Sequence, residues 1–216
     1  MKRIRKNFIT SISLLTAFVL WTVAICFVDV QEVGPQGSSV GFASLNRFFH
    51  NLTGVNLGLY NLTDWLGLVP IGVAFSFAVL GLAQWIKRKK LAKVDKSLFV
   101  LSGFYIVVMT VYFLFETVAI NYRPVLIGGY LEVSYPSSTT LLVMCVMSTA
   151  MMKFNAHIKN KMLRRCVLLI IALFIVFMVI GRLVSGVHWL TDIIGGVIIS
   201  AGLVMAYAGV YDILSR

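Results

Sequence analysis

The sequence predicts an all-α protein built as a bundle of six membrane-spanning helices. Of its 216 residues, 59% are hydrophobic and only 12% are charged, whereas soluble domains average about 25% charged residues. Several apolar runs approach or exceed the roughly 20 residues that a helix needs to cross the hydrocarbon core of a bilayer. No linker or low-complexity tract divides the chain, so we expect a single integral-membrane domain over residues 1–216.

Six apolar runs define the predicted spans. They are Phe8 to Val28, Leu66 to Trp85, Ser97 to Ile120, Ser138 to Met152, Cys166 to Val184 and His188 to Tyr211. The first run follows a basic segment that resembles the start of a signal peptide, but it is longer than a typical signal core and no convincing small-residue cleavage site follows it. We therefore expect the first run to remain as a span. The fourth run is the shortest of the six.

The longest segment between two predicted spans runs from Asp29 to Asp64. It contains a turn-rich stretch at residues 34–39. Apolar residues then recur at helical spacing, namely Phe42, Leu45, Phe48, Phe49 and Leu52. We expect a short interfacial helix from Phe42 to Leu52, lying on the membrane rather than crossing it.

The basic residues predict the orientation, because Lys and Arg near span ends stay on the cytoplasmic side. With the N-terminus inside, sixteen of the nineteen fall on the cytoplasmic side. The other three are Arg47, Arg123 and Arg182. We therefore expect an N-in, C-in topology. The net charge of +11 then reflects topology and contact with anionic lipid headgroups, rather than nucleic-acid binding.

Arg182, His188 and Asp192 form an R-x5-H-x3-D pattern near the predicted outer ends of the last two spans. If the last helix begins at Val187, His188 and Asp192 share one helical face. The carboxylate would then hold one imidazole nitrogen and leave the other as a nucleophile. A structural His-Asp pair and an arginine snorkelling at a helix end are the alternatives. Taken together, the three residues indicate a phosphoryl-transfer site.

A second polar cluster lies in the predicted loop between the third and fourth spans. Arg123-Pro124 is followed by Pro136 and then by the hydroxyl residues Ser137, Ser138 and Thr139. A proline before serines and threonines is typical of a helix start, and the free N–H groups there bind anions. Arg123 and Arg182 lie on the same predicted side, so both can clamp phosphate oxygens. We expect these residues to bind phosphate.

Three short motifs resemble the signatures of the type 2 phosphatidic acid phosphatase and haloperoxidase superfamily. They are Arg123-Pro124, then Pro136-Ser137, then Arg182 with Gly186-Val187-His188 and Asp192. The resemblance covers the third to sixth spans, and its last motif is the most specific. It implies that His188 attacks phosphorus and that Asp192 orients His188. It also implies that Arg123, Ser137 and Arg182 bind phosphate.

Two positions depart from the family pattern. Glu116 stands where the family usually has a lysine, and its carboxylate would repel phosphate unless it were protonated or paired, for example with Arg123. Thr139 stands where the family usually has the histidine that protonates the leaving group. Threonine is a poor proton donor to a departing oxygen, although it can hydrogen-bond phosphate. The family's Pro-Ser-Gly-His motif also has Ser138 in place of glycine.

The missing acid favours a substrate with a good leaving group. An alkoxide leaves with a pKa near that of water, about 15.7, so its departure needs a proton. A phosphate monoester has a second pKa of roughly 6 and can leave without one. We therefore expect a lipid phosphatase that favours a lipid diphosphate, such as polyprenyl diphosphate, over a lipid phosphate. The resemblance implies a phosphohistidine intermediate at the outer face of a bacterial plasma membrane.

No metal or cofactor is expected, because His50, His157 and His188 are scattered along the chain. Three other functions remain open. A weakened relative would bind lipid phosphate without turnover, and a phosphotransferase would pass the phosphoryl group to another lipid. A small channel or transporter would carry charges near the bilayer midplane, and Glu116 is the only candidate for such a charge.

Overall fold

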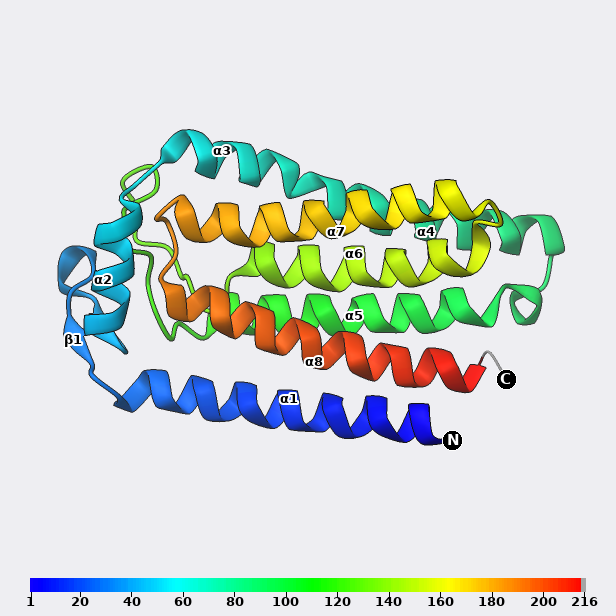
Figure 1. The fold of residues 1–216 in the computed structure, drawn as a ribbon, viewed down its shortest axis with the longest axis horizontal. Helices are drawn as coiled ribbons and strands as arrows, with labels where there is room; N and C mark the ends of the chain where they lie inside the picture. The colour runs from blue at the N-terminus through cyan, green and yellow to red at the C-terminus, as the bar shows by residue number, and fades with distance from the viewer. Residues whose placement is uncertain (215–216) are drawn as a thin grey trace.

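The computed structural model describes residues 1–214, and within them six helical segments are long and apolar enough to cross a membrane. They are α1 (Lys2–Phe27), α3 and α4 together (Leu57–Leu66 and Leu68–Arg88), α5 (Lys96–Thr117), α6 (Ser138–His157), α7 (Lys161–Val184) and α8 (Leu190–Leu214). The predicted six-span bundle is confirmed. The spans run side by side, and the N-terminus and the last turn of α8 lie at the same end (Figure 1).

Short elements cover the other end of the bundle. They are β1 (Gln31–Glu32), the 3-10 turn η1 (Pro35–Gly37), β2 (Ser39–Val40) and α2 (Ala43–Thr53), and β1 pairs antiparallel with β2. Helix α2 lies across the direction of the spans (Figure 1). The short helix expected from the sequence is therefore present, one residue later than predicted, and its place on the membrane surface stays a prediction. A second 3-10 turn, η2 (Leu91–Lys93), precedes α5.

The second span begins earlier than its apolar run predicts. The sequence places a loop up to Asp64, but the structure has α3 there, with the Asn56 side chain accepting a hydrogen bond from the Leu59 N–H at 2.9 Å. Helix α3 gives way to α4 at Gly67. Pro70 lies in the first turn of α4 and has no N–H to donate to the carbonyl of Leu66, which explains the break. The hydropathy pattern therefore did not predict α3 (Leu57–Leu66), which we call the α3 arm.

Three other predicted boundaries are wrong because charged residues lie inside helices. Helix α1 begins at Lys2 rather than Phe8. Helix α6 continues past Met152 to His157, since Lys153 is buried, donates a hydrogen bond to Ser97 and lies 5.5 Å from the centre of the Tyr211 ring. Helix α7 begins at Lys161 rather than Cys166, because the Asn160 side chain caps its first N–H groups. A charge near the end of an apolar run therefore does not mark the end of the helix.

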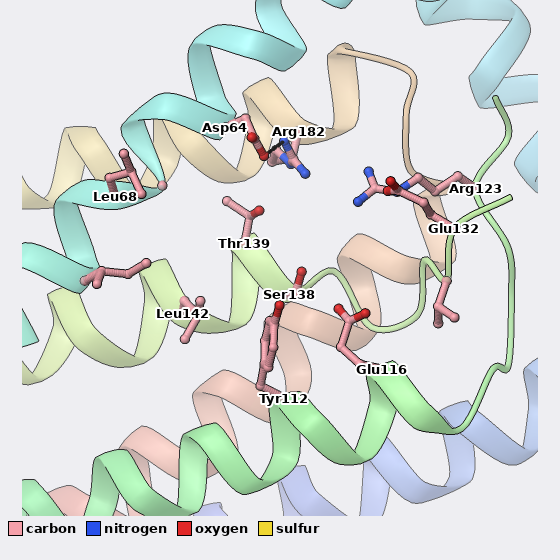
Figure 2. A pocket seen from close by; sticks show the side chains of 13 residues that line it. Asp64, Leu68, Tyr112, Glu116, Arg123, Glu132, Ser138, Thr139, Leu142 and Arg182 are labelled. Atoms are coloured by element: carbon pink, nitrogen blue, oxygen red, sulfur yellow. Dashed lines mark ion pairs between the residues drawn. The ribbon is translucent and has the colours of Figure 1, made fainter. Parts of the chain in front are cut away.

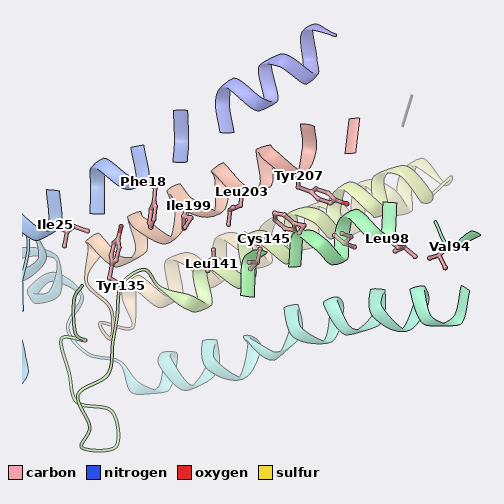
Figure 3. Close-up of a cluster of buried hydrophobic side chains, with 13 residues drawn as sticks. Phe18, Ile25, Val94, Leu98, Tyr135, Leu141, Cys145, Ile199, Leu203 and Tyr207 are labelled. Carbon is pink, nitrogen blue, oxygen red and sulfur yellow. The ribbon is translucent and has the colours of Figure 1, made fainter. Parts of the chain in front are cut away.

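Helices α6 and α8 form the centre of the bundle. Half of the residues in their most apolar stretches are buried, against 6% in the α3–α4 span. The main core joins α1, α5, α6 and α8 (Figure 3), with contributions from Phe18, Leu101, Leu141, Cys145, Ile199 and Leu203 among others. A smaller cluster joins α6 to α7 through Val143, Met147, Ile171 and Met178. The polar end of the bundle is therefore supported by two rigid helices.

Helices α1 and α8 approach closely at Gly202, where an added Cβ would lie 2.9 Å from a methyl carbon of Leu15. We expect Gly202→Leu to destabilise the bundle by about 1–3 kcal/mol, as overpacking of a filled interior does. The measurement is the midpoint of thermal unfolding of the detergent-solubilised protein. Gly103→Leu is the matched control, because Gly103 faces open space. An equal midpoint for the two variants would contradict the predicted close packing.

Candidate active site

A polar cavity of about 570 Å³ opens between α4, α5, α6 and α7. Figure 2 shows Arg182 and Asp64 on one side of this cavity and Tyr112 and Glu116 on the other. Its polar lining consists of Asp64, Tyr112, Glu116, Arg123, Glu132, Ser138, Thr139 and Arg182. Five of the residues that the sequence singled out, Glu116, Arg123, Ser138, Thr139 and Arg182, therefore meet at one cavity although they come from distant parts of the chain.

His188 lies buried behind the two arginines. Its Nε2 atom is 3.4 Å from Nη1 of Arg123 and 3.3 Å from Nη2 of Arg182. The sequence predicted that His188 and Asp192 would share a helical face, but α8 begins only at Leu190, so His188 precedes the helix. Arg182, His188 and Asp192 therefore lie close together as predicted, but His188 is in the turn before α8 and not within the helix.

Asp192 acts as a cap for α8. Its Oδ2 atom accepts a hydrogen bond from the backbone N–H of Trp189 at 2.9 Å, in the manner of the acidic residue of a capping box. Its Oδ1 atom accepts one from the side-chain amide of Asn121 at 3.1 Å. The Oδ2 atom is 4.0 Å from Nδ1 of His188, which is beyond hydrogen-bonding distance. The expected direct bond between the two side chains is therefore absent.

Ser134 fills the space between these two side chains. Its Oγ atom is 2.9 Å from Nδ1 of His188 and 2.5 Å from Oδ2 of Asp192. Ser134 was not among the residues expected from the sequence. It is one serine in an irregular loop, and no spacing distinguishes it.

The loop from 118 to 137 is held by backbone bonds that fold it back on itself. The N–H of Arg123 donates to the carbonyl of Glu132 at 3.0 Å, and the N–H of Ser134 donates to the carbonyl of Asn121 at 2.9 Å. Tyr122 and Val133 form a bridge between these two bonds. One short ladder therefore places both Arg123 and Ser134 beside His188.

Each arginine is paired with a carboxylate that the sequence analysis did not assign. Nε of Arg123 is 2.9 Å from a carboxylate oxygen of Glu132, and Nη1 of Arg182 is 3.5 Å from one of Asp64. Arg123 was one partner that could have neutralised Glu116, but within residues 1–214 the ion pair of Arg123 is with Glu132. The Asp64 side chain is 59% exposed, so water screens its pairing.

Tyr60 of α3 lies against both guanidinium groups. Its ring centre is 4.8 Å from Cζ of Arg182 and 5.8 Å from Cζ of Arg123, within the range of a cation–π contact. Tyr60 and Asp64 are one helical turn apart on α3. The unpredicted helix α3 therefore supplies the side chains that hold the two arginines in place.

The start of α6 divides its hydroxyl residues between two roles. Ser137 is fully buried and caps the helix, its Oγ accepting from the N–H and the hydroxyl of Thr140 at 3.5 and 3.1 Å. Ser138 and Thr139 line the polar cavity instead (Figure 2). Of the three expected phosphate ligands in this segment, the structure therefore brings two to the cavity, whereas Ser137 is buried and its N–H donates to the carbonyl of Asp192.

Gly186 fixes the turn that carries His188. Its φ of +67° favours glycine, and an added Cβ would lie 1.9 Å from the carbonyl oxygen of Gly54. The carbonyl of Ser185 also accepts a hydrogen bond from the N–H of Asn56 at 3.0 Å. The turn before His188 is therefore packed against the connection between α2 and α3.

Burial lowers the pKa of His188 well below its ordinary value of 6.5, and the positive charges of Arg123 and Arg182 act in the same direction. The imidazole is therefore neutral at neutral pH. With Nε2 facing two cationic donors, the lone pair of a neutral imidazole is directed at them. Such a nitrogen has the protonation state that a nucleophile requires.

We predict that His188 is neutral at neutral pH, because its pKa lies well below the ordinary value of 6.5. Arg123→Gln should raise the pKa of His188, because removing a nearby positive charge favours the protonated ring. NMR titration of ¹⁵N-histidine-labelled protein measures both. Arg47→Gln, which alters an arginine on α2, is the matched control. A His188 that titrates near pH 6.5 in the unaltered protein would contradict the prediction.

Comparisons with known proteins bear on the family and the fold. Residues 116–214 match the family model of the PAP2 superfamily. The fold is similar to that of the transmembrane PAP2-type phosphatidylglycerolphosphate phosphatase from Bacillus subtilis, with a TM-score of 0.56, 18% sequence identity, and coverage of 96% of this chain and 98% of that chain. No curated protein sequence matches the chain significantly. The comparisons therefore support a PAP2-type segment over residues 116–214, within a fold that is shared over nearly the whole chain.

Proposed function

We propose that the protein hydrolyses the terminal phosphate of a membrane lipid diphosphate through a phosphohistidine on His188. The match of residues 116–214 to the PAP2 superfamily supports the coarser statement that the protein is an integral-membrane lipid phosphatase, a phosphoric ester hydrolase. The observation that carries the finer proposal is the position of His188 Nε2 between two guanidinium groups whose side chains line the polar cavity.

In the first step, His188 Nε2 attacks the terminal phosphorus. An N–P bond forms, the bond from phosphorus to the bridging oxygen breaks, and the electron pair leaves with that oxygen. Arg123 and Arg182 neutralise the charge on the nonbridging oxygens. Arg182 Nε is buried and lacks a hydrogen-bond partner within residues 1–214, so a phosphate oxygen would satisfy it. Ser138, Thr139 and the free N–H groups of α6 supply further donors.

In the second step, a water molecule attacks the phosphorus of the phosphohistidine. The new P–O bond replaces the N–P bond, whose electron pair returns to Nε2. The proton of the water leaves with the released phosphate or passes to solvent. The chain's own part in both steps is to position the phosphoryl group and to stabilise its charge, which dominate phosphoryl transfer in other enzymes.

The position of Thr139 supports a diphosphate as the substrate. Thr139 lines the cavity at the place of the family's proton donor, and its hydroxyl is a weak acid. A departing phosphate monoester needs no proton, since its second pKa is roughly 6. We therefore infer a preference for a polyprenyl diphosphate over a phosphomonoester such as phosphatidate.

An apolar cavity of about 380 Å³ adjoins the polar one and supports a lipid substrate. It lies between α4, α5 and α6 and shares Ile71, Tyr112 and Leu142 with the polar cavity. Its other lining residues include Pro70, Ala74, Val108, Met109 and Val146. A phosphate held by the arginines would therefore have its hydrocarbon chain directed between α4 and α5.

The proposed orientation places the polar cavity on the outer side of a bacterial plasma membrane. The end that holds the cavity carries Arg47, Arg123 and Arg182. The opposite end carries the N-terminus and the α4–α5 and α6–α7 connections (Figure 1), where the other basic residues concentrate. Basic segments favour the cytoplasmic side, which supports an outward-facing site.

Glu116 favours a second candidate function. It lines the cavity opposite Arg182 (Figure 2), and the ion pairs within residues 1–214 do not include it. A carboxylate there weakens the binding of a dianionic phosphate. A relative that binds lipid phosphate without turnover would have this feature.

The first experiment measures phosphate release from a polyprenyl diphosphate by the detergent-solubilised protein with chelator present. We expect release in the unaltered protein and a decrease of roughly 10⁴-fold or more in His188→Ala, since loss of a nucleophile costs rates on this scale. His157→Ala is the matched control, because His157 ends α6 at the opposite end of the bundle. Binding of the lipid without release would instead support the second candidate. Release abolished by chelator would contradict metal independence, and equal turnover of phosphatidate would remove the diphosphate preference.

A second experiment tests the course of the hydrocarbon chain. Ala74→Trp fills the apolar cavity, so we expect kcat/KM for the long-chain lipid to fall about tenfold or more, equivalent to about 1.4 kcal/mol. Turnover of a short-chain soluble diphosphate should stay unchanged. Gly103→Trp adds the same side chain to open space on α5 and is the matched control. Equal losses with both substrates would contradict the assignment of the apolar cavity to the lipid chain.

A further inference from the structure

Ser134 is the one side chain that contacts both His188 Nδ1 and Asp192 Oδ2 among the residues described. We propose that Ser134 is a positioning residue that carries the influence of Asp192 to His188 and sets the tautomer in which His188 Nε2 is the nucleophile. This inference rests on the proposed function for its kinetic consequence. The family resemblance did not imply it, since there the aspartate itself orients the histidine.

The distances leave little room for another arrangement. Nδ1 of His188 is 4.0 Å from the nearest carboxylate oxygen of Asp192, whereas Ser134 Oγ is within 3 Å of both atoms. Ser134 is 2% exposed, so bulk water does not replace its hydroxyl. Its backbone is fixed by the hydrogen bond to the carbonyl of Asn121.

The protons in this group can be assigned from donor and acceptor chemistry. An ionised Asp192 only accepts hydrogen bonds, so the single hydroxyl proton of Ser134 points to Oδ2. The Ser134 oxygen must then accept from His188, which puts the ring proton on Nδ1. On the other side of the ring, Arg123 and Arg182 only donate, so Nε2 is the bare nitrogen. Both sides of the ring thus require the same tautomer.

The chain of hydrogen bonds also bears on the reaction. When Nε2 bonds to phosphorus, the ring gains positive charge while its Nδ1 proton stays in place. Ser134 then accepts a stronger, charge-assisted hydrogen bond and donates more strongly to Asp192. The other bonds of Asp192, from the Trp189 N–H and the Asn121 amide, hold the carboxylate still. Through Ser134, the Asp192 carboxylate therefore stabilises the imidazolium although it makes no direct hydrogen bond to His188.

The kinetic test compares Ser134→Ala, Ser134→Thr and the unaltered protein. We expect Ser134→Ala to lower kcat about 10- to 100-fold with KM nearly unchanged, less than the roughly 10⁴-fold loss on altering a directly bonded orienting aspartate in a serine protease. Ser134→Thr should recover most of the loss, because it restores the hydroxyl. Ser200→Ala, which removes another buried hydroxyl, is the matched control.

A double-mutant cycle with Asp192→Asn separates positioning from a purely structural role. If Ser134 acts through Asp192, Ser134→Ala should cause little further loss in the Asp192→Asn background, whereas independent roles would give additive losses. An unchanged kcat in Ser134→Ala, or additive losses, would overturn the proposal. An inactive unaltered protein would instead contradict the proposed function.

The tautomer of His188 can be measured without turnover. Failure of the Ser134 proposal can therefore be distinguished from failure of the proposed function. Long-range ¹H–¹⁵N NMR spectra of histidine-labelled protein report which ring nitrogen carries the proton, and His188→Gln assigns the signal. We expect the Nδ1–H form in the unaltered protein and its partial loss in Ser134→Ala. An Nε2–H form in the unaltered protein would overturn the proposal whether or not the protein is active.

Discussion

The polar end of this protein must hold two positively charged guanidinium groups buried side by side, those of Arg123 and Arg182. Arg182 is 1% exposed and Arg123 is 8% exposed, and both guanidinium groups face one nitrogen of His188. Isolated buried charges are costly, so other elements must compensate them. The loop from 118 to 137 provides Glu132, and α3 provides Asp64 and Tyr60. Both segments therefore fold in a way that brings compensating side chains to the two arginines.

The same constraint explains why the histidine is neutral and why a phosphate suits the site. The burial and positive charge that lower the pKa of His188 also attract an anion. A bound phosphate would offset the repulsion between the two arginines that exists without it. The imidazole ring gains positive charge when Nε2 bonds to phosphorus, and the two arginines repel that charge. The negative charge of the phosphate would offset this repulsion. In the proposed reaction, phosphate binding and the nucleophilicity of His188 would therefore be coupled through the charges of the two arginines.

The sequence predicted the six spans, and it grouped Arg182, His188 and Asp192, because both signals are local in sequence: apolar runs of sufficient length, and a triplet with fixed spacing. It missed α3 because Leu57–Leu66 is interrupted by polar residues and precedes Pro70, so its helicity did not register as part of a span. It missed Ser134, Glu132 and Tyr60 because their roles arise only when distant segments meet. The predicted start of the last span at His188 was too early, because the Asp192 side chain accepts a hydrogen bond from the Trp189 N–H and α8 begins only at Leu190.

The length of the α3–α4 span has a consequence for how a lipid would reach His188. Its 32 residues extend about 48 Å at 1.5 Å per residue, whereas the hydrocarbon core is about 30 Å thick. In the proposed orientation, the α3 arm would reach the level of the headgroups, where Tyr60 and Asp64 would hold the arginines. A lipid phosphate already rests at this depth. The proposed lipid substrate would then not have to be lifted from its leaflet, which would cost about 0.8 kcal/mol for each methylene drawn into water. It would reach the site by moving sideways within the bilayer.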